Sequence, residues 1–182
     1  MNYATIKWAD VANGPGVRVS LFVSGCTHQC PGCFNPEAWD FTFGESFTPE
    51  VEEKILAALA PAHMKGLSLL GGEPFEPANQ RVLLPFLRRV KEQYPDKTVW
   101  CYSGYTLDEE LWKPSRARCE CTDEMLSLLD ILVDGEFVQA KKDLSLRFRG
   151  SSNQRIIDVP KSLAAREVVL WDGAMTIESI KK

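Results

Sequence analysis

Three cysteines within eight residues are the part of this sequence most able to do chemistry. Cys26, Cys30 and Cys33 have the spacing C-x3-C-x2-C inside residues 24–35. A Pro-Gly pair between the last two cysteines disfavours a regular helix there, so we expect a loop that wraps three thiolates around one centre. A closed zinc site needs four Cys or His ligands and a fully ligated cubane cluster needs four cysteines. Three thiolates therefore predict a metal or cluster site with one coordination position open.

Other interpretations of the cysteines remain open at this point. A structural zinc site completed by His28 or by a distant cysteine would use the same motif, as would an iron–sulfur redox sensor without catalysis. Cys101 is expected to be a packed small side chain in a strand. Cys119 and Cys121 are either a reactive thiol pair or ordinary surface cysteines. Without a disulfide-forming compartment, closely spaced cysteines favour metal binding over cross-linking.

Three further stretches place glycine or polar residues directly after an expected strand. They are Gly71, Gly72, Glu73 and Pro74 after residues 66–70, Ser103 after residues 97–102, and Asp134 after residues 131–133. Adjacent glycines let the backbone approach a ligand closely, and a carboxylate or carbonyl can accept a hydrogen bond from a cationic group. A plain strand-to-helix turn is the alternative for the glycine stretch, and turn capping is the alternative for Asp134.

The elements that must position these residues alternate between strands and helices. A β-branched run predicts a strand at 17–23 that leads into the cysteine motif. Helices are expected from Thr48, as N-cap before Pro49, to near residue 61, at 79–94, from about 107, and at 123–129; further strands are expected at 66–70, 97–102, 131–133, 155–159 and 167–171. This alternation predicts an α/β fold, a mainly parallel sheet with outer helices. Such sheets place their sites at the carboxyl ends of the strands, where all four stretches should meet.

The length and composition predict one ordinary globular domain. The chain has 182 residues, 45% hydrophobic and 25% charged, so we expect a single domain over residues 1–182, with a core at about 10–160 and a C-terminal extension at 161–182 of uncertain role. A net charge of −4 argues against nucleic acid as a partner. Residues 1–10 lack the apolar stretch of a signal peptide and no segment suits a membrane span, so we expect a cytoplasmic protein.

Taken together, the motifs resemble a known superfamily. A C-x3-C-x2-C motif after the first strand, with Gly-Gly-Glu-Pro after the second, is similar to the radical S-adenosylmethionine enzymes. Within them, residues 13–16, 24–35 with Trp39, 132–137, and the Arg-Gly-Ser-Ser-Asn-Gln stretch at 149–154 resemble the activating proteins of anaerobic (class III) ribonucleoside-triphosphate reductases. The resemblance covers about residues 10–158. It implies a partial (β/α)6 radical-SAM barrel.

The resemblance also implies a role for each candidate residue. Cys26, Cys30 and Cys33 would hold a 4Fe–4S cluster whose fourth iron binds S-adenosylmethionine. The turn Gly71, Gly72, Glu73 and Pro74 would bind the methionyl ammonium; Gly32, Cys33 and Phe34 would flank the adenine; Ser103 would contact the ribose or carboxylate, and Asp134 would contact the ligand or orient a neighbour. Residues 149–154 would close the site or dock a partner.

The implied activity is the generation of a protein radical. An electron from an external donor such as flavodoxin or ferredoxin would cleave S-adenosylmethionine to methionine and a 5′-deoxyadenosyl radical. That radical would remove hydrogen from a backbone glycine of the anaerobic ribonucleoside-triphosphate reductase. The close alternative is the activating enzyme of another glycyl-radical enzyme, such as pyruvate formate-lyase.

Overall fold

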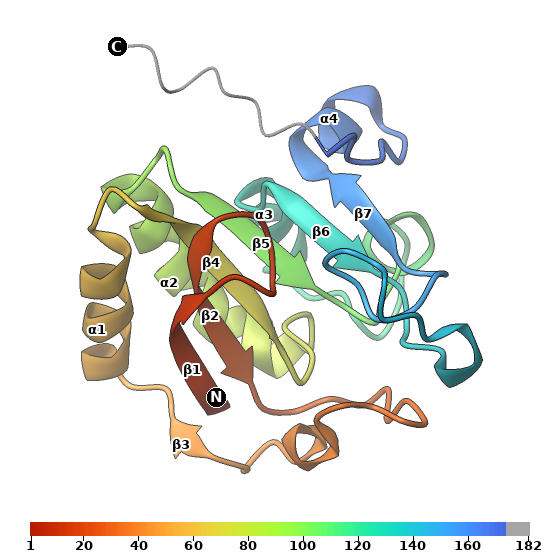
Figure 1. The fold of residues 1–182 in the computed structure, drawn as a ribbon, viewed down its shortest axis with the longest axis horizontal. Helices are drawn as coiled ribbons and strands as arrows, with labels where there is room; N and C mark the ends of the chain where they lie inside the picture. The colour runs from red at the N-terminus through yellow and green to blue at the C-terminus, as the bar shows by residue number, and fades with distance from the viewer. Residues whose placement is uncertain (174–182) are drawn as a thin grey trace.

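A computed structural model describes residues 1–173, so part of the expected C-terminal extension lies outside the described residues. The strands form one sheet in the order β3-β1-β2-β4-β5-β6-β7 (Figure 1). Their bounds are β1 Asn2–Asp10, β2 Val17–Val23, β3 Glu45–Ser46, β4 Met64–Gly71, β5 Thr98–Tyr102, β6 Ile131–Asp134 and β7 Arg155–Asp158. The chain is therefore a mixed α/β protein, as predicted.

The sheet has a parallel centre and antiparallel edges. Strands β2, β4, β5 and β6 run parallel, whereas β1 is antiparallel to β2 and β3, and β7 is antiparallel to β6. The sheet therefore has four of the six parallel strands of a complete (β/α)6 barrel. The direction of β7 follows from its connection, because residues 135–154 contain only the three-residue 3₁₀ turn η3 (Gln139–Lys141) and no crossover helix.

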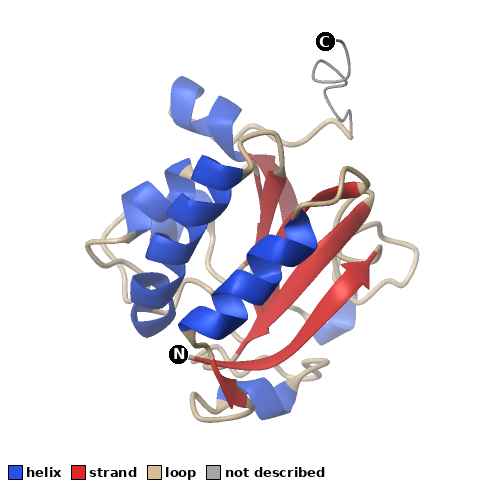
Figure 2. Cartoon of the chain, turned by 90° about the vertical axis from the view of Figure 1, so that its left-hand side faces the viewer, coloured by secondary structure: helices blue, strands red, loops and turns tan. Residues whose placement is uncertain are grey.

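Helices cover one face of this sheet (Figure 2). They are α1 Pro49–Leu59, α2 Pro77–Gln93 and α3 Thr122–Ser127. The other helical segments are η1 Pro36–Trp39, the π-helical turn η2 Leu107–Leu111, and α4 Val159–Ala165. Helix α1 begins at Pro49 after Thr48, as the sequence predicts, and its apolar stripe is buried in a core shared with β4 and α2. Among the described residues, no helix combines the length and hydropathy needed to cross a bilayer.

Four elements were not predicted and one expected strand is absent. The sequence patterns do not indicate β1, β3, η3 or α4. The strand expected at 167–171 is reduced to an isolated bridge between Ile157 and Leu170. Backbone bonds from Asp158 N to Val169 O and from Trp171 N to Ile156 O, both 2.9 Å, keep this segment beside β7 without a regular ladder.

The turn at residues 11–16 closes the sheet face opposite the helices. Arg18 is fully buried there, and its guanidinium donates to Ser68 Oγ at 2.8 Å, which itself donates to Asn13 O at 2.6 Å. A Cβ on Gly14 would lie 3.0 Å from the Arg18 side chain, so glycine permits this close packing. Buried Asp10 accepts hydrogen bonds from this turn and from the adjacent strand β2.

Candidate functional site

The carboxyl ends of the four parallel strands open into one cavity of about 560 Å³. Its wall combines the cysteine segment after β2, the glycine turn after β4, the start of the loop after β5, and Gly135 after β6. The structure thus brings together the four stretches that the sequence places after strands. The predicted site residues that line the cavity are Cys26, Cys30, Gly32, Cys33, Phe34, Gly71, Gly72, Glu73 and Ser103. Pro74 and Asp134 lie outside its lining.

The three cysteines are half-buried free thiols on this wall. Burial, and then the charge of Glu73, raises the pKa of Cys26 to about 12; burial also raises the pKa of Cys30. Both thiols are therefore protonated at neutral pH in the metal-free chain. An iron or zinc centre would have to displace these protons, which couples metal binding to proton release.

The donor set suits a cluster in which each thiolate binds a different iron atom. Three cysteine sulfurs face one cavity, and cysteine thiolates are the usual ligands of iron–sulfur clusters. Within residues 1–173, no three Cys, His, Asp or Glu side chains are placed to hold a single metal ion. A cubane cluster spreads its thiolates over separate iron atoms, so these three residues fit that group.

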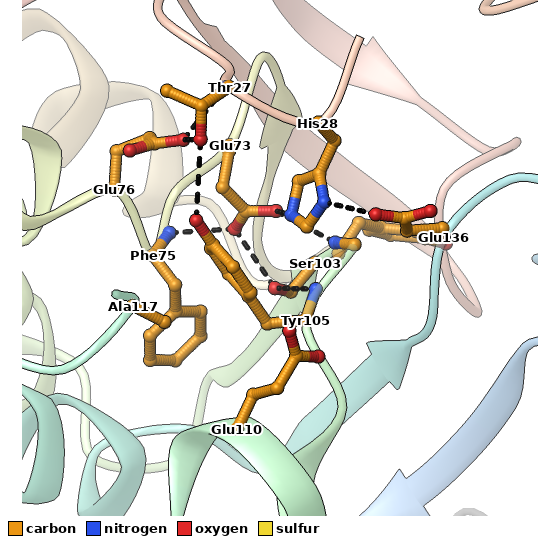
Figure 3. A network of polar contacts seen from close by, with 12 residues as sticks. Thr27, His28, Glu73, Phe75, Glu76, Ser103, Tyr105, Glu110, Ala117 and Glu136 are labelled. Carbon is orange, nitrogen blue, oxygen red and sulfur yellow. Dashed lines mark hydrogen bonds and ion pairs between the residues drawn. The ribbon is translucent and has the colours of Figure 1, made fainter. Parts of the chain in front are cut away.

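Two residues between the cysteines anchor the loop to the segment after β4 (Figure 3). Thr27 donates through its backbone N–H and its hydroxyl to Glu76 Oε1, at 2.8 and 2.6 Å. The His28 ring is almost fully buried, with Nε2 3.2 Å from Glu73 Oε2, outside hydrogen-bond geometry, and Nδ1 2.8 Å from Glu136 Oε1. Burial lowers the pKa of His28, but Glu73 and then Glu136 outweigh it and leave this pKa above its usual value.

The two glycines after β4 are required by packing between strand ends. Gly71 has φ +110°, and a Cβ there would lie 2.7 Å from backbone atoms of β2. A Cβ on Gly72 would lie 2.6 Å from Gly25 O. Backbone bonds from Gly72 N to Val23 O at 2.7 Å and from Glu73 N to Gly25 O at 2.8 Å close the junction. The same glycines line the cavity, so a ligand would meet main chain at this point.

The Glu73 carboxylate is already occupied by donors of the protein itself. It is 1% exposed. Its Oε1 accepts from Phe75 N at 2.8 Å and Ser103 Oγ at 2.9 Å, and its Oε2 accepts from Gly104 N at 2.7 Å (Figure 3). Glu73 therefore joins the loops after β4 and β5 and, through His28, the cysteine loop.

Ser103 and Asp134 are likewise held by neighbouring groups. The Ser103 hydroxyl, which donates to Glu73, accepts from Tyr105 N at 3.0 Å. Asp134 is fully buried and accepts from Leu107 N at 2.8 Å and from the Arg155 guanidinium at 2.5 and 2.9 Å. The Asp134 carboxylate thus ties β6 to β7 and to η2, while Ser103 remains on the cavity wall.

The stretch 149–154 closes another side of the cavity. The Gln154 side chain accepts from Gly150 N at 2.8 Å and donates to Gly135 O at 3.0 Å. Asn153 donates to Glu136 O at 2.8 Å. Arg149, Gly150 and Gln154 line the cavity. This turn therefore folds back onto the loop that follows β6.

Several residues that shape the site have no role in the prediction from sequence. Glu76 and Tyr105 were assigned none, Glu136 appeared only within the stretch 132–137 that carries the family resemblance, and His28 appeared only as the alternative fourth ligand of a zinc site. A histidine between two cysteines and an acid three residues beyond Glu73 were the available signals. Of the other cysteines, Cys101 is fully buried in the core, as expected, and neither Cys119 nor Cys121 lines the cavity.

Comparison with known proteins identifies first an iron–sulfur domain and then a protein family. Residues 12–157 match the family model of the 4Fe-4S single cluster domain. The chain is 47% identical over 158 residues to the anaerobic ribonucleoside-triphosphate reductase-activating protein of Haemophilus influenzae, covering 86% of this chain and 97% of the relative. It is 45% identical to the protein of that name from Vibrio cholerae, with the same coverage.

A more distant relative agrees. The anaerobic ribonucleoside-triphosphate reductase-activating protein of Enterobacteria phage T4 is 35% identical over 158 residues, which cover 86% of this chain and 93% of the relative. The chain belongs to the family of anaerobic ribonucleoside-triphosphate reductase-activating proteins. The family resemblance found in the sequence is thereby confirmed.

Proposed function

We propose that the chain is a radical S-adenosylmethionine activating enzyme that generates a glycyl radical on an anaerobic ribonucleoside-triphosphate reductase. The cavity at the carboxyl ends of β2, β4, β5 and β6 is the single observation that carries this proposal. It gathers three thiols, a close-packed glycine backbone and polar strand ends. Two relatives named anaerobic ribonucleoside-triphosphate reductase-activating protein align with 86% of this chain. The proposed cofactors are one 4Fe–4S cluster and S-adenosyl-L-methionine.

The protein's own contribution is binding, orientation and enclosure. Cys26, Cys30 and Cys33 would each ligate one iron. These ligands would hold a 4Fe–4S cluster, which would supply one electron for cleavage of the C5′–S bond of S-adenosylmethionine and so allow hydrogen removal from the target glycine. The main chain at Gly71 and Gly72 would receive the methionyl ammonium.

The remaining candidate residues take two kinds of role in this proposal. Gly32, Cys33 and Phe34 would flank the adenine, and Ser103 would contact the ribose or carboxylate. Glu73 would act mainly by holding the loops together, because its oxygens accept three hydrogen bonds within the protein. Pro74 would shape the turn and Asp134 would orient Arg155, since neither lines the cavity.

The partial (β/α)6 barrel is the proposed architectural assignment. Four parallel strands with their carboxyl ends on one cavity, and a helical layer on the outer face, support it. We also propose a single domain in the cytoplasm that receives its electron from an external donor.

The test combines reconstitution with two readouts. The chain is reconstituted anaerobically with iron and sulfide, reduced with dithionite and given S-adenosylmethionine, and 5′-deoxyadenosine is measured by mass spectrometry. The same mixture is then incubated with the anaerobic reductase or with pyruvate formate-lyase, and the glycyl radical is recorded by electron paramagnetic resonance. We expect 5′-deoxyadenosine and a radical on the reductase.

The alternatives predict different results. A radical on formate-lyase alone would move the chain to another class of glycyl-radical activases. Uptake of one zinc without cluster absorption would support a non-catalytic zinc module, and a cluster without 5′-deoxyadenosine would support a redox sensor.

A further inference from the structure

The loop after β6 lies directly against the cysteine loop (Figure 1). Glu136 Oε1 is 2.8 Å from His28 Nδ1. A Cβ on Gly32 would lie 2.0 Å from the Gln139 side chain. Lys142 and Arg149, which follow this segment, line the same cavity as the three thiols.

Those residues carry a concentrated positive charge on an acidic protein. Residues 141–149 contain four basic side chains and one acidic one, whereas the whole chain has a net charge of −4. We define the basic strip as Lys141, Lys142, Arg147 and Arg149. The carboxylate of the acidic residue, Asp143, accepts from the Ser145 backbone and hydroxyl at 2.8 and 2.7 Å within its own turn.

Three of the four side chains in the basic strip are available to a partner, whereas the half-buried Arg149 guanidinium donates to Gln154 O at 2.6 Å. Lys141, Lys142 and Arg147 are exposed, and none of them forms an ion pair with a carboxylate in the part of the chain that the structure describes. Two apolar side chains accompany it: Leu144, within the same loop, is 91% exposed and Phe34, on the cysteine loop, is 75% exposed. Exposed cations around a small apolar centre are the features of a transient, electrostatically steered interface.

We propose that the basic strip is the docking surface for an acidic one-electron carrier protein that reduces the cluster. This inference rests on the proposed function, which requires an electron from outside the chain. The electron must enter at the cysteine loop, and Lys142 and Arg149 of the strip line the same cavity as the three cysteines. A carrier must also leave after each transfer, which suits a small charged contact better than a large apolar one.

The experiment compares a protein donor with a small chemical donor. Lys141→Glu/Arg147→Glu reverses two strip charges that do not line the cavity, and Lys54→Glu/Lys65→Glu is the matched control on exposed lysines of α1 and β4. Bleaching of the reconstituted cluster is followed by stopped flow with reduced flavodoxin and, separately, with dithionite. We expect the flavodoxin rate of the strip variant to fall at least about tenfold at low salt. Its dithionite rate and the flavodoxin rate of the control should match those of the wild type.

The remaining outcomes test the docking surface and the proposed function separately. An unchanged flavodoxin rate, or an equal loss in the control, would overturn the docking surface. Loss of glycyl-radical formation in the strip variant after dithionite reduction would also overturn it, because the strip would then bind the reductase. A wild-type cluster that flavodoxin reduces through the strip, but that never yields 5′-deoxyadenosine, would leave the docking surface standing and refute the proposed function.

Discussion

Replacing Glu73 with Gln should destabilise the apo-protein, because the buried carboxylate accepts three hydrogen bonds from fixed donors. A glutamine offers one oxygen in place of two. Turning the amide nitrogen toward Gly104 sacrifices one bond at 2.7 Å, whereas turning it toward Phe75 and Ser103 sacrifices the Phe75 bond and also forces the Ser103 hydroxyl to change from donor to acceptor. The first orientation is therefore the less costly one.

The cost can be estimated from the bonds that change. A hydrogen bond to a charged group contributes about 1.5–3 kcal/mol, and an unsatisfied buried N–H costs about 1–3 kcal/mol. The loss at Gly104, together with weaker bonds from Phe75 and Ser103, gives a decrease of about 2–4 kcal/mol in the free energy of unfolding. For a chain of this length that corresponds to a fall in Tm of about 5–15 °C.

Urea unfolding and calorimetry of the apo-protein measure this effect. Glu120→Gln is the matched control, since Glu120 forms an exposed ion pair with Arg81, and such pairs contribute little. We expect the control to unfold like the wild type. If Glu73→Gln has the same midpoint and slope as the control, Glu73 does not hold the strand-end loops together.

Three other predictions address single features of the site and fold. Cys30→Ala should abolish cluster retention and 5′-deoxyadenosine formation, whereas Cys119→Ala should keep both; equal loss would mean that the ligand set is misassigned. Gly32→Ala should lower the free energy of unfolding by about 1–2 kcal/mol, because Gly32 has φ +74°; adding Gln139→Ala should relieve the steric clash but not this backbone cost, so complete rescue would contradict the assignment. Burial raises the pKa of the Asp10 carboxyl, but its hydrogen bonds outweigh burial and lower the pKa overall. The Asp10 carboxylate therefore stabilises the fold fully above the ordinary pKa of about 3.9, and this stabilisation is lost as the pH falls through the lower pKa of the folded state. The stability difference between wild type and Asp10→Asn should therefore be larger at pH 7 than at pH 3 in urea titrations, and an equal difference at both would refute this.

The sequence predicts the parallel core well because its signals are local. The strand β2 has the expected bounds, and a Thr-Pro start with an apolar stripe is enough to locate α1. The strand β1 was missed since much of it is exposed, with Trp8 47% exposed, so it lacks the apolar pattern of a central strand. The antiparallel direction of β7 depends on how residues 135–154 return, which no local signal specifies.

The meeting of the cysteine segment, the glycine turn and Ser103 at one cavity could be predicted from the sequence, but not the direction of each side chain. The three cysteines and the glycine turn follow strands, so their meeting at one edge is a consequence of topology. Whether the Glu73 carboxylate faces a ligand or the protein depends on donors 30 and 31 residues away. Asp134 depends in the same way on Arg155, 21 residues further along the chain. These long-range contacts become visible only in the fold.

The most direct test of the account is Mössbauer spectroscopy of the chain reconstituted with ⁵⁷Fe, with and without S-adenosylmethionine. Three cysteine ligands predict a 4Fe–4S cluster with one iron site distinct from the other three. We expect only the parameters of that site to change when S-adenosylmethionine is added. Four equivalent irons that do not respond, or no cluster at all, would contradict a site completed by the ligand.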